Sequence, residues 1–295
     1  MRDPYIYFDK ESEIYSLIVQ SAFAPVGQRV GGAGVVRYTS SDLEKWSYSG
    51  RLLSRSGSDE RLIWAPKLYR FKGHFYVVFT ETKTRPSYNL HTPNNSLFKK
   101  AVRDVLIYRA DRIEGPYSFH STLISNRAVL DASMFFHDDN AYLLYSVEWD
   151  PGQGGRIVYS ELNESLDKLV DGEFELVGPD ADFGAGSPIY PLVTDSPQLI
   201  VREEDDELLL FWSTFTNANK YTVVYTDCAG FFAGTACEGP TFQLGVYDGG
   251  HQTVFRGAAG KVYISYHQPN AKGKELLVVK GFDLVGLEHD GKGLK

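Results

Sequence analysis

The clearest repeating pattern in the sequence is a short hairpin with a polar residue directly before its first strand. In Ala128–Ser146, the carboxylate of Asp131 precedes an apolar run, and a second run rich in Tyr and Leu follows. Asp138–Asn140 lies between the two runs. We expect it to form the turn, because Asp and Asn tolerate the left-handed backbone of a tight turn. The pattern predicts two antiparallel strands with a carboxylate at the head of the first.

The same arrangement occurs four more times along the chain. The five heads are Asp3, Trp64, Asp131, Asp195 and His251, and by subtraction of their numbers they are 61, 67, 64 and 56 residues apart. Each interval holds several short strand-like runs, and no segment keeps the 3.6-residue period of a helix. A period of roughly 60 residues with almost no helix predicts a five-bladed β-propeller.

We therefore expect an all-β chain that forms one propeller domain, with blades at approximately residues 1–60, 61–127, 128–190, 191–246 and 247–295. A β-sandwich or jelly roll also consists of short strands and polar turns. Neither explains why a polar or aromatic head recurs before each first hairpin. The segment Arg85–Lys100 exceeds an ordinary turn, and we expect it to lie as a loop over one face.

Composition and charge exclude several classes of partner. The 295 residues carry a formal net charge of −8, which argues against nucleic acid or an anionic membrane. Tyr (19) and Phe (18) far outnumber Met (2), and such aromatic content suits both strands and sugar-binding surfaces. No apolar run approaches the roughly 20 residues of a membrane helix. The N-terminus has no basic and apolar leader, so we expect a cytoplasmic protein, or a secreted one if a leader has been removed.

The two cysteines, Cys228 and Cys237, are nine residues apart in a Gly-rich segment. A loop disulfide between them is one interpretation. In a chain without a leader for secretion, two free thiols are the favoured one.

Three of the five heads are carboxylates, namely Asp3, Asp131 and Asp195. The innermost strands of a propeller surround its axis, so residues at their starts converge on one mouth. Carboxylates gathered there shift one another's pKa values apart, and acid–base catalysis requires such a difference. A single Asp at a strand start is more often a turn cap, but three at equivalent repeat positions favour catalysis.

Five short motifs resemble, in their order, those of glycoside hydrolase family 43. They are Arg2-Asp3-Pro4, Trp64-Ala65-Pro66, Leu130-Asp131-Ala132, Thr194-Asp195-Ser196-Pro197 and Gly249-Gly250-His251. The resemblance covers nearly the whole chain. It implies a five-bladed propeller that cleaves glycosidic bonds with inversion, often those of α-L-arabinofuranosides or β-xylosides. The expected enzyme is exo-acting, on oligosaccharides of plant cell walls.

The resemblance also implies roles for single residues. Asp3 matches the general base, and Asp131 matches the carboxylate that tunes and orients the general acid. Asp195 lies where the family's acid, usually a glutamate, is expected. Because aspartate is one methylene shorter, Glu148 is a second candidate, at the end of the strand that returns beside Asp131. Asp195 ranks first because of its position in the motif.

Three further residues complete the expected site. Lys67 is a departure, since the family's Trp-Ala-Pro motif usually continues with an acidic residue. Trp64 stacks on a sugar or lines the pocket, with packing in the core as an equal alternative. His251 matches a histidine that helps to hold a hydrated cation in many relatives. A lone histidine is more often a structural residue, so we expect no required cofactor and no metal ligand set, and place any structural calcium near His251.

Two other functions stay open at this stage. One is a carbohydrate-binding propeller that has lost catalysis. Lys67 and the aspartate at position 195, in place of the family's usual glutamate, are consistent with this alternative. The other is a retaining fructan hydrolase or transferase of related fold. The absence of an Asn-Asp-Pro-Asn entry motif counts against the second. In all three cases the expected partner is an oligosaccharide.

Overall fold

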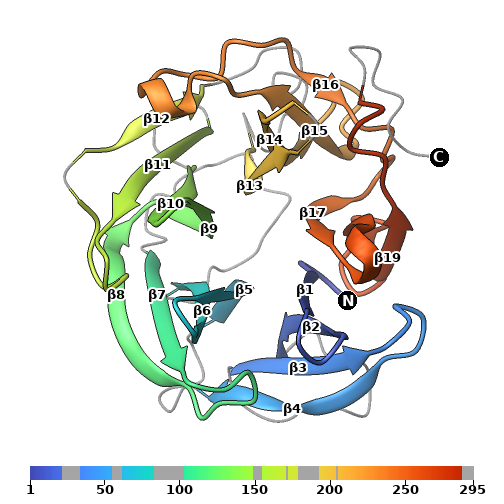
Figure 1. Ribbon diagram of the computed structural model, residues 1–295. Coiled ribbons are helices and arrows are strands. Elements are labelled where there is room, and N and C mark those ends of the chain that lie inside the picture. Colours follow the sequence, from blue (N-terminus) through green and yellow to red (C-terminus); the bar gives the residue numbers. More distant parts are fainter. Residues whose placement is uncertain are drawn as a thin grey trace.

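Five antiparallel sheets surround a central axis in the computed structural model of the chain (Figure 1). It describes residues 1–21, 34–54, 62–82, 103–148, 155–170, 172–178, 193–203 and 205–287. The strands β1, β5, β9, β13 and β17 lie innermost, each at the edge of its own sheet. This arrangement confirms the predicted all-β class and the five-bladed propeller. The predicted loop at Arg85–Lys100 lies outside the described residues.

The blades follow one another in chain order. Blade I contains β1 (Tyr5–Asp9), β2 (Ile14–Gln20), β3 (Gly34–Ser40) and β4 (Ser47–Ser54), and blade II contains β5 (Leu62–Phe71), β6 (His74–Thr82), β7 (Arg103–Ala110) and β8 (Ser118–Arg127). Blade III contains β9 (Val129–His137), β10 (Asn140–Val147), β11 (Arg156–Leu162) and β12 (Phe174–Val177). Blade IV contains β13 (Asp195–Arg202), β14 (Glu207–Phe215), β15 (Tyr221–Asp227) and β16 (Phe242–Gln243). Blade V contains β17 (Gly250–Arg256), β18 (Val262–Gln268) and β19 (Leu276–Gly281), and two short 3-10 turns are η3 (Phe231–Ala233) and η4 (Ala258–Gly260).

The turns inside the blades use the residues that the sequence pattern indicates. In the hairpin of β9 and β10, His137 pairs with Asn140, and Asp138 between them has a φ of 51°. In the hairpin of β5 and β6, Lys72 and Gly73 both have positive φ. Asp and Gly tolerate this left-handed backbone, which a two-residue hairpin turn requires.

The hydrophobic core is divided into five clusters, and each joins the facing sheets of two neighbouring blades. Between blades III and IV, for example, Leu144 and Tyr159 pack with Leu210 and Trp212. The cluster between blades V and I closes the circle, with Phe255 of β17 packed against Tyr15 of β2. Since every blade is covered on both sides, central strands such as β6 are buried along nearly their whole length. No helix among the described residues is long and apolar enough to cross a membrane.

The chain bends at the same point in the innermost segment of every blade. In blades II to V the pairing of the first two strands skips residues at this point, as in a β-bulge. One residue at each bend has a positive φ, between 44° and 57°: Asp3, Ala65, Asp131, Ser196 and His251. Non-glycine residues in this conformation are strained, and such strain gathers at functional sites. The bends therefore mark the mouth of the propeller.

The positions of the bends correct the predicted alignment of the five head residues. Asp195 and Trp64 do not occupy the bend but lie one residue before it, at the position of Arg2 in blade I. The three predicted carboxylates are thus not at equivalent positions. Proline directly follows the bend residue in three blades, as Pro4, Pro66 and Pro197. Aligning these three repeats on their prolines places the bend residues correctly from the sequence alone.

In blades II to V, the side chain two residues after the bend contacts the backbone of the next blade around the ring. We call these contacts the belt: Lys67 Nζ to Asp131 O (3.4 Å), Ser133 Oγ to Pro197 O (2.5 Å), Gln198 Nε2 to Val254 O (2.8 Å) and Thr253 Oγ1 to Pro4 O (3.2 Å). The last contact joins blade V to blade I and so closes the ring. Ser, Gln and Thr make these contacts as neutral donors, and only Lys67 carries a charge.

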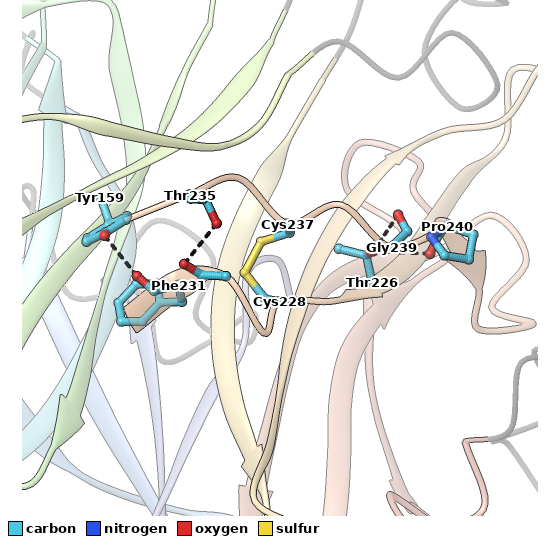
Figure 2. The surroundings of a disulfide bond; sticks show 9 residues. Tyr159, Thr226, Cys228, Phe231, Thr235, Cys237, Gly239 and Pro240 are labelled. Carbon is cyan, nitrogen blue, oxygen red and sulfur yellow. Dashed lines mark hydrogen bonds between the residues drawn. A yellow bond between two sulfur atoms is a disulfide. The ribbon is translucent and has the colours of Figure 1, made fainter. Parts of the chain in front are cut away.

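A disulfide joins Cys228 and Cys237 between β15 and β16, which corrects the expectation of two free thiols (Figure 2). The loop that it closes packs against blade III. Cys237 donates its N–H to the carbonyl of Leu176 (2.8 Å), and the carbonyl of Phe231 accepts a hydrogen bond from the Tyr159 hydroxyl (3.1 Å). The disulfide therefore stabilises the contact between blades III and IV at their outer strands.

Candidate active site

The bends bring Asp3, Asp131, Asp195 and His251 together at the axis. The Nδ1 atom of His251 lies 3.3 Å from Asp3 Oδ1 and 3.7 Å from Asp131 Oδ2. One polar atom each from Asp131, Asp195 and His251 lies within 4.8 Å of the others. Four residues predicted from the sequence therefore form one cluster, with contributions from blades I, III, IV and V.

Asp131 is the most enclosed carboxylate of this cluster. Its side chain is buried, and its Oδ2 accepts the backbone N–H of Ser196 (3.0 Å). Its own N–H donates to Thr80 Oγ1 on β6 (3.1 Å). Burial raises the pKa of Asp131 to about 6, while the nearby His251 and Lys67 favour the charged form. At neutral pH the group is therefore ionised, and it fixes the backbone directly after Asp195.

Asp195 retains some exposed surface and is held by Tyr221, whose hydroxyl donates to its Oδ2 at 2.8 Å. Burial of the carboxyl group raises its pKa well above the usual range, and the neighbouring charge of Glu148 raises it further. This shift favours the protonated form of the carboxyl group. It is suited to donate a proton to a group that enters the mouth.

Glu148 lies behind Asp195 rather than in the open mouth. Only 2% of its surface is exposed, and its Oε1 accepts the backbone N–H of Thr194 (2.5 Å). Burial raises the pKa of Glu148 to about 7. As predicted, its strand returns beside the head of blade III, since the Glu148 N–H donates to Ala128 O (3.1 Å). This placement favours Asp195 as the acid and gives Glu148 a position from which it can influence that acid.

Asp3 is flanked by Arg2, its neighbour in the motif Arg2-Asp3-Pro4, and by His267, which the sequence analysis does not single out. The guanidinium of Arg2 lies 3.5 Å from its Oδ1, and His267 Nδ1 lies 3.7 Å from the same atom. His267 is the penultimate residue of β18, and Tyr221 begins β15, so both are at the mouth end of strands outside the innermost position. Their position at strand ends beside polar turns is the only signal in the sequence that could have revealed them.

Trp64 and Lys67 occupy blade II. Trp64 is half-buried, and the guanidinium of Arg103 lies 5.1 Å from the centre of its ring, as in a cation–π contact. Lys67 is buried, with 4% of its surface exposed. Burial lowers the pKa of Lys67 to about 8, against the opposing effect of Asp131 and Asp3. Its amino group is therefore an ammonium ion at neutral pH.

Asp131, Asp195 and His251 each offer one ligand atom to a cation placed between them. Calcium takes about six to eight oxygen ligands, so water molecules would have to supply most of the set. Both carboxylates already accept hydrogen bonds, and the ammonium of Lys67 interacts with Asp131. His251 Nε2 is buried without a hydrogen-bond partner in the part of the chain that the structure describes. A structural calcium ion near His251 therefore stays a prediction, and no step of the reaction uses it.

Comparison with known proteins agrees with this geometry. The xylosidase/arabinosidase 43B of Humicola insolens is 30% identical over 148 residues, which are 46% of this chain and only 25% of that protein. The crystal structure of an endo-arabinase from Bacteroides thetaiotaomicron has a TM-score of 0.75 at 24% identity and covers 99% of this chain and 96% of its own. A xylan β-1,4-xylosidase from Bacillus halodurans has a TM-score of 0.67 at 19% identity, and the match covers 96% of this chain but 52% of that one.

The family comparison extends over almost the whole sequence. The model of glycosyl hydrolases family 43 matches residues 1–282, which include all five bends and every residue of the cluster. The solved relatives share the fold. The chain therefore belongs to glycosyl hydrolases family 43, a family of glycosidases.

Proposed function

We propose that this chain is an inverting glycoside hydrolase that acts on oligosaccharides of plant cell walls, as an α-L-arabinofuranosidase or a β-xylosidase. The observation that carries the proposal is the contrast between two carboxyl groups. Asp195 is held by Tyr221, and burial raises its pKa, which favours the protonated form. Asp3 lies across the mouth, with the guanidinium of Arg2 3.5 Å from its Oδ1. One acid and one base in a single mouth are what inverting hydrolysis requires.

In the proposed reaction, Asp195 donates its proton to the glycosidic oxygen while the bond from that oxygen to the anomeric carbon breaks. A water molecule attacks the anomeric carbon from the opposite face and loses a proton to Asp3. The leaving alcohol thus takes the proton of Asp195, and the sugar takes the hydroxyl of the water. Asp131 orients the acid, because it binds the N–H of Ser196 next to Asp195.

The relatives support the choice of sugar. They are described as a xylosidase/arabinosidase, an endo-arabinase and a xylan β-1,4-xylosidase. Arabinofuranose and xylose are both pentoses, so we take both as candidate substrates of the same binding pocket. Release of single sugars from chain ends stays a prediction.

Hydrolysis of a panel of nitrophenyl glycosides tests the proposal directly. We expect release of nitrophenol from the α-L-arabinofuranoside or the β-D-xyloside, and much slower release from the β-D-galactoside. The Asp3→Asn variant is the inactive control. Oligosaccharide binding without turnover on arabino- and xylo-oligosaccharides would instead identify a carbohydrate-binding propeller.

A further inference from the structure

Blade V differs from the other blades in the residue that directly follows its bend. In blades I to IV this residue has no polar side chain: Pro4, Pro66, Ala132 and Pro197. In blade V it is Gln252, whose side-chain amide can both donate and accept hydrogen bonds. Only 1% of its surface is exposed. Burying an amide costs free energy unless its polar atoms are hydrogen-bonded, so the partners of Gln252 indicate what it stabilises.

Both polar atoms of the Gln252 side chain contact blade IV. Its Nε2 donates to the carbonyl oxygen of Ser196 (2.9 Å), and its Oε1 accepts the hydroxyl of Ser213 (2.6 Å). In return, the Ser196 hydroxyl donates to the backbone carbonyl of Gln252 (3.1 Å). Because a carbonyl oxygen can only accept, the amide has a single orientation that satisfies both serines. Gln252 and Ser196 are thus joined by two hydrogen bonds of opposite direction.

Ser196 is the bend residue of blade IV and the neighbour of Asp195. Its φ of 54° is a conformation that a non-glycine residue keeps only where surrounding contacts hold it. Its N–H donates to Asp131 Oδ2 (3.0 Å), whereas its carbonyl and its hydroxyl are both bound by Gln252. Two of these three contacts, which hold the strained backbone beside the acid, therefore come from Gln252.

A second route connects Gln252 to the strand of the acid. Asp195 pairs with Ser213 across β13 and β14. The Ser213 hydroxyl, which donates to Gln252, also accepts the backbone N–H of His251 (2.8 Å). Gln252 therefore holds the residue that follows the acid and the residue that lies opposite it. Ser196 and Ser213 have no exposed surface, so water cannot readily replace these hydrogen bonds.

We propose that Gln252 is a positioning residue, which directs the Asp195 carboxyl group by holding the Ser196 bend against blade V. The consequence for catalysis rests on the proposed function, in which Asp195 is the general acid. Without the amide, the bend relaxes toward the ordinary negative-φ backbone and turns the peptide beside Asp195. Aspartate has one rotatable bond fewer than glutamate, so its carboxyl group follows the backbone closely. A displacement of about 1 Å can lower a rate about 100-fold.

The test compares Gln252→Met with a matched variant, Gln198→Met. Methionine keeps the length of the side chain and removes its hydrogen bonds. Gln198 also joins blades IV and V by two bonds, since its Nε2 donates to Val254 O (2.8 Å) and its Oε1 accepts the Val254 N–H (2.9 Å). It lies two residues beyond Ser196, further from the acid. Both variants should lower the melting temperature, so stability alone does not distinguish a positioning role from a structural one.

The leaving group of the substrate makes that distinction. We compare kcat/KM for the phenyl and the 2,4-dinitrophenyl glycoside of the pentose that the chain hydrolyses, because phenol needs protonation to leave and dinitrophenol needs little. Gln252→Met should lower kcat/KM by about 10–100-fold on the phenyl glycoside and by less than about threefold on the other. Gln198→Met should leave the ratio of the two values unchanged. Equal losses on both substrates in Gln252→Met would overturn the proposal.

A second measurement needs no substrate. It is hydrogen exchange of the Ser196 amide in protein labelled with ¹⁵N-serine, assigned with Ser196→Ala. Gln252→Met should accelerate this exchange by about tenfold or more, and Gln198→Met should not. Ser213→Ala, which removes one partner of Gln252, should act in the same direction and decides the question if Gln252→Met does not fold. Unchanged exchange would overturn the proposal, whereas a chain that hydrolyses no glycoside would refute the proposed function and leave this measurement valid.

Discussion

At the scale of single residues, three aspartates with the same chemistry acquire different properties from their surroundings. Asp195 is held by a tyrosine hydroxyl beside another carboxyl group, Asp131 accepts a backbone N–H, and Asp3 lies beside a guanidinium. Burial raises the pKa values of Asp131 and Asp195, and a carboxyl group with a raised pKa is suited to act as an acid.

The base is tested by Asp3→Asn, which keeps the shape of the side chain but cannot take a proton from water. We expect kcat/KM to fall by about 10²–10⁴-fold, with the melting temperature nearly unchanged. Asp138→Asn is a matched control, because Asp138 also has a positive φ (51°) but lies exposed at the β9–β10 turn. Turnover of Asp3→Asn equal to that of this control would refute the assignment.

The position of Glu148 leads to a prediction about pH. A general acid must be protonated, so activity is lost as the pH rises through the pKa of Asp195. The charge of Glu148 raises that pKa. Glu148→Gln removes the charge and retains an oxygen for the N–H of Thr194, so the basic limb of the pH–rate profile should move to lower pH.

The exposed Glu164 provides the control for this measurement, since Glu164→Gln removes an equal charge outside the mouth. If Glu148 were itself the acid, Glu148→Gln would abolish activity on natural oligosaccharides. It would then be rescued on an aryl glycoside whose leaving group needs little protonation. A shifted but active enzyme identifies Asp195 as the acid.

How far the sequence predicts the site depends on where each residue lies. Asp3, Asp131 and His251 stand at bends and next to recognisable motifs, so sequence alone places them. Tyr221 and His267 reach the cluster only because strand ends of different blades meet in space, whereas Arg2 adjoins Asp3 in the sequence. No local pattern contains that information, and the same holds for the pairing of Lys67 with Asp131.

At the scale of elements, the sequence predicts the hairpins well and their irregularities poorly. The alternation of apolar residues and the Asx and Gly turns identify β5–β6 and β9–β10 correctly. The bends, however, depend on strained backbone at Ala65 and Ser196, residues that show no preference for positive φ. The residue types at these two bends therefore do not reveal them, although the prolines that follow, Pro66 and Pro197, mark both positions in the sequence.

The disulfide in the loop between β15 and β16 can be tested directly by mutation. Closing a loop of this length stabilises a protein by about 2–3 kcal/mol, chiefly through the unfolded chain. We expect replacement of both Cys228 and Cys237 by Ala to lower the free energy of unfolding by this amount in urea. Glycosidase activity should stay the same, because the loop contacts β12 and, through Phe231, the part of β9 that lies away from Asp131. Loss of activity at unchanged stability would contradict this assignment.

At the scale of the whole molecule, the propeller brings residues from different blades together at its mouth. No single blade forms the site. Five separate cores hold the blades side by side, and Thr253 connects the last blade to the first at Pro4. The mouth therefore exists only when the ring is closed. The period of roughly 60 residues predicts this closure, since a repeat of short strands must bury both faces of every sheet.

The stereochemistry of the product tests this whole arrangement. Asp3 belongs to blade I and Asp195 to blade IV, so the base and the acid approach the sugar from different sides of the mouth. An inverting pair needs a separation of about 6.5–9.5 Å between its carboxyl groups to leave room for water, whereas a retaining pair stands about 5–5.5 Å apart. Proton NMR in the first minutes of hydrolysis should show a product whose anomeric configuration is opposite to that of the substrate. A product with retained configuration, or a glycosyl group trapped on Asp3, would refute the mechanism, although the five-bladed fold and the family would stand.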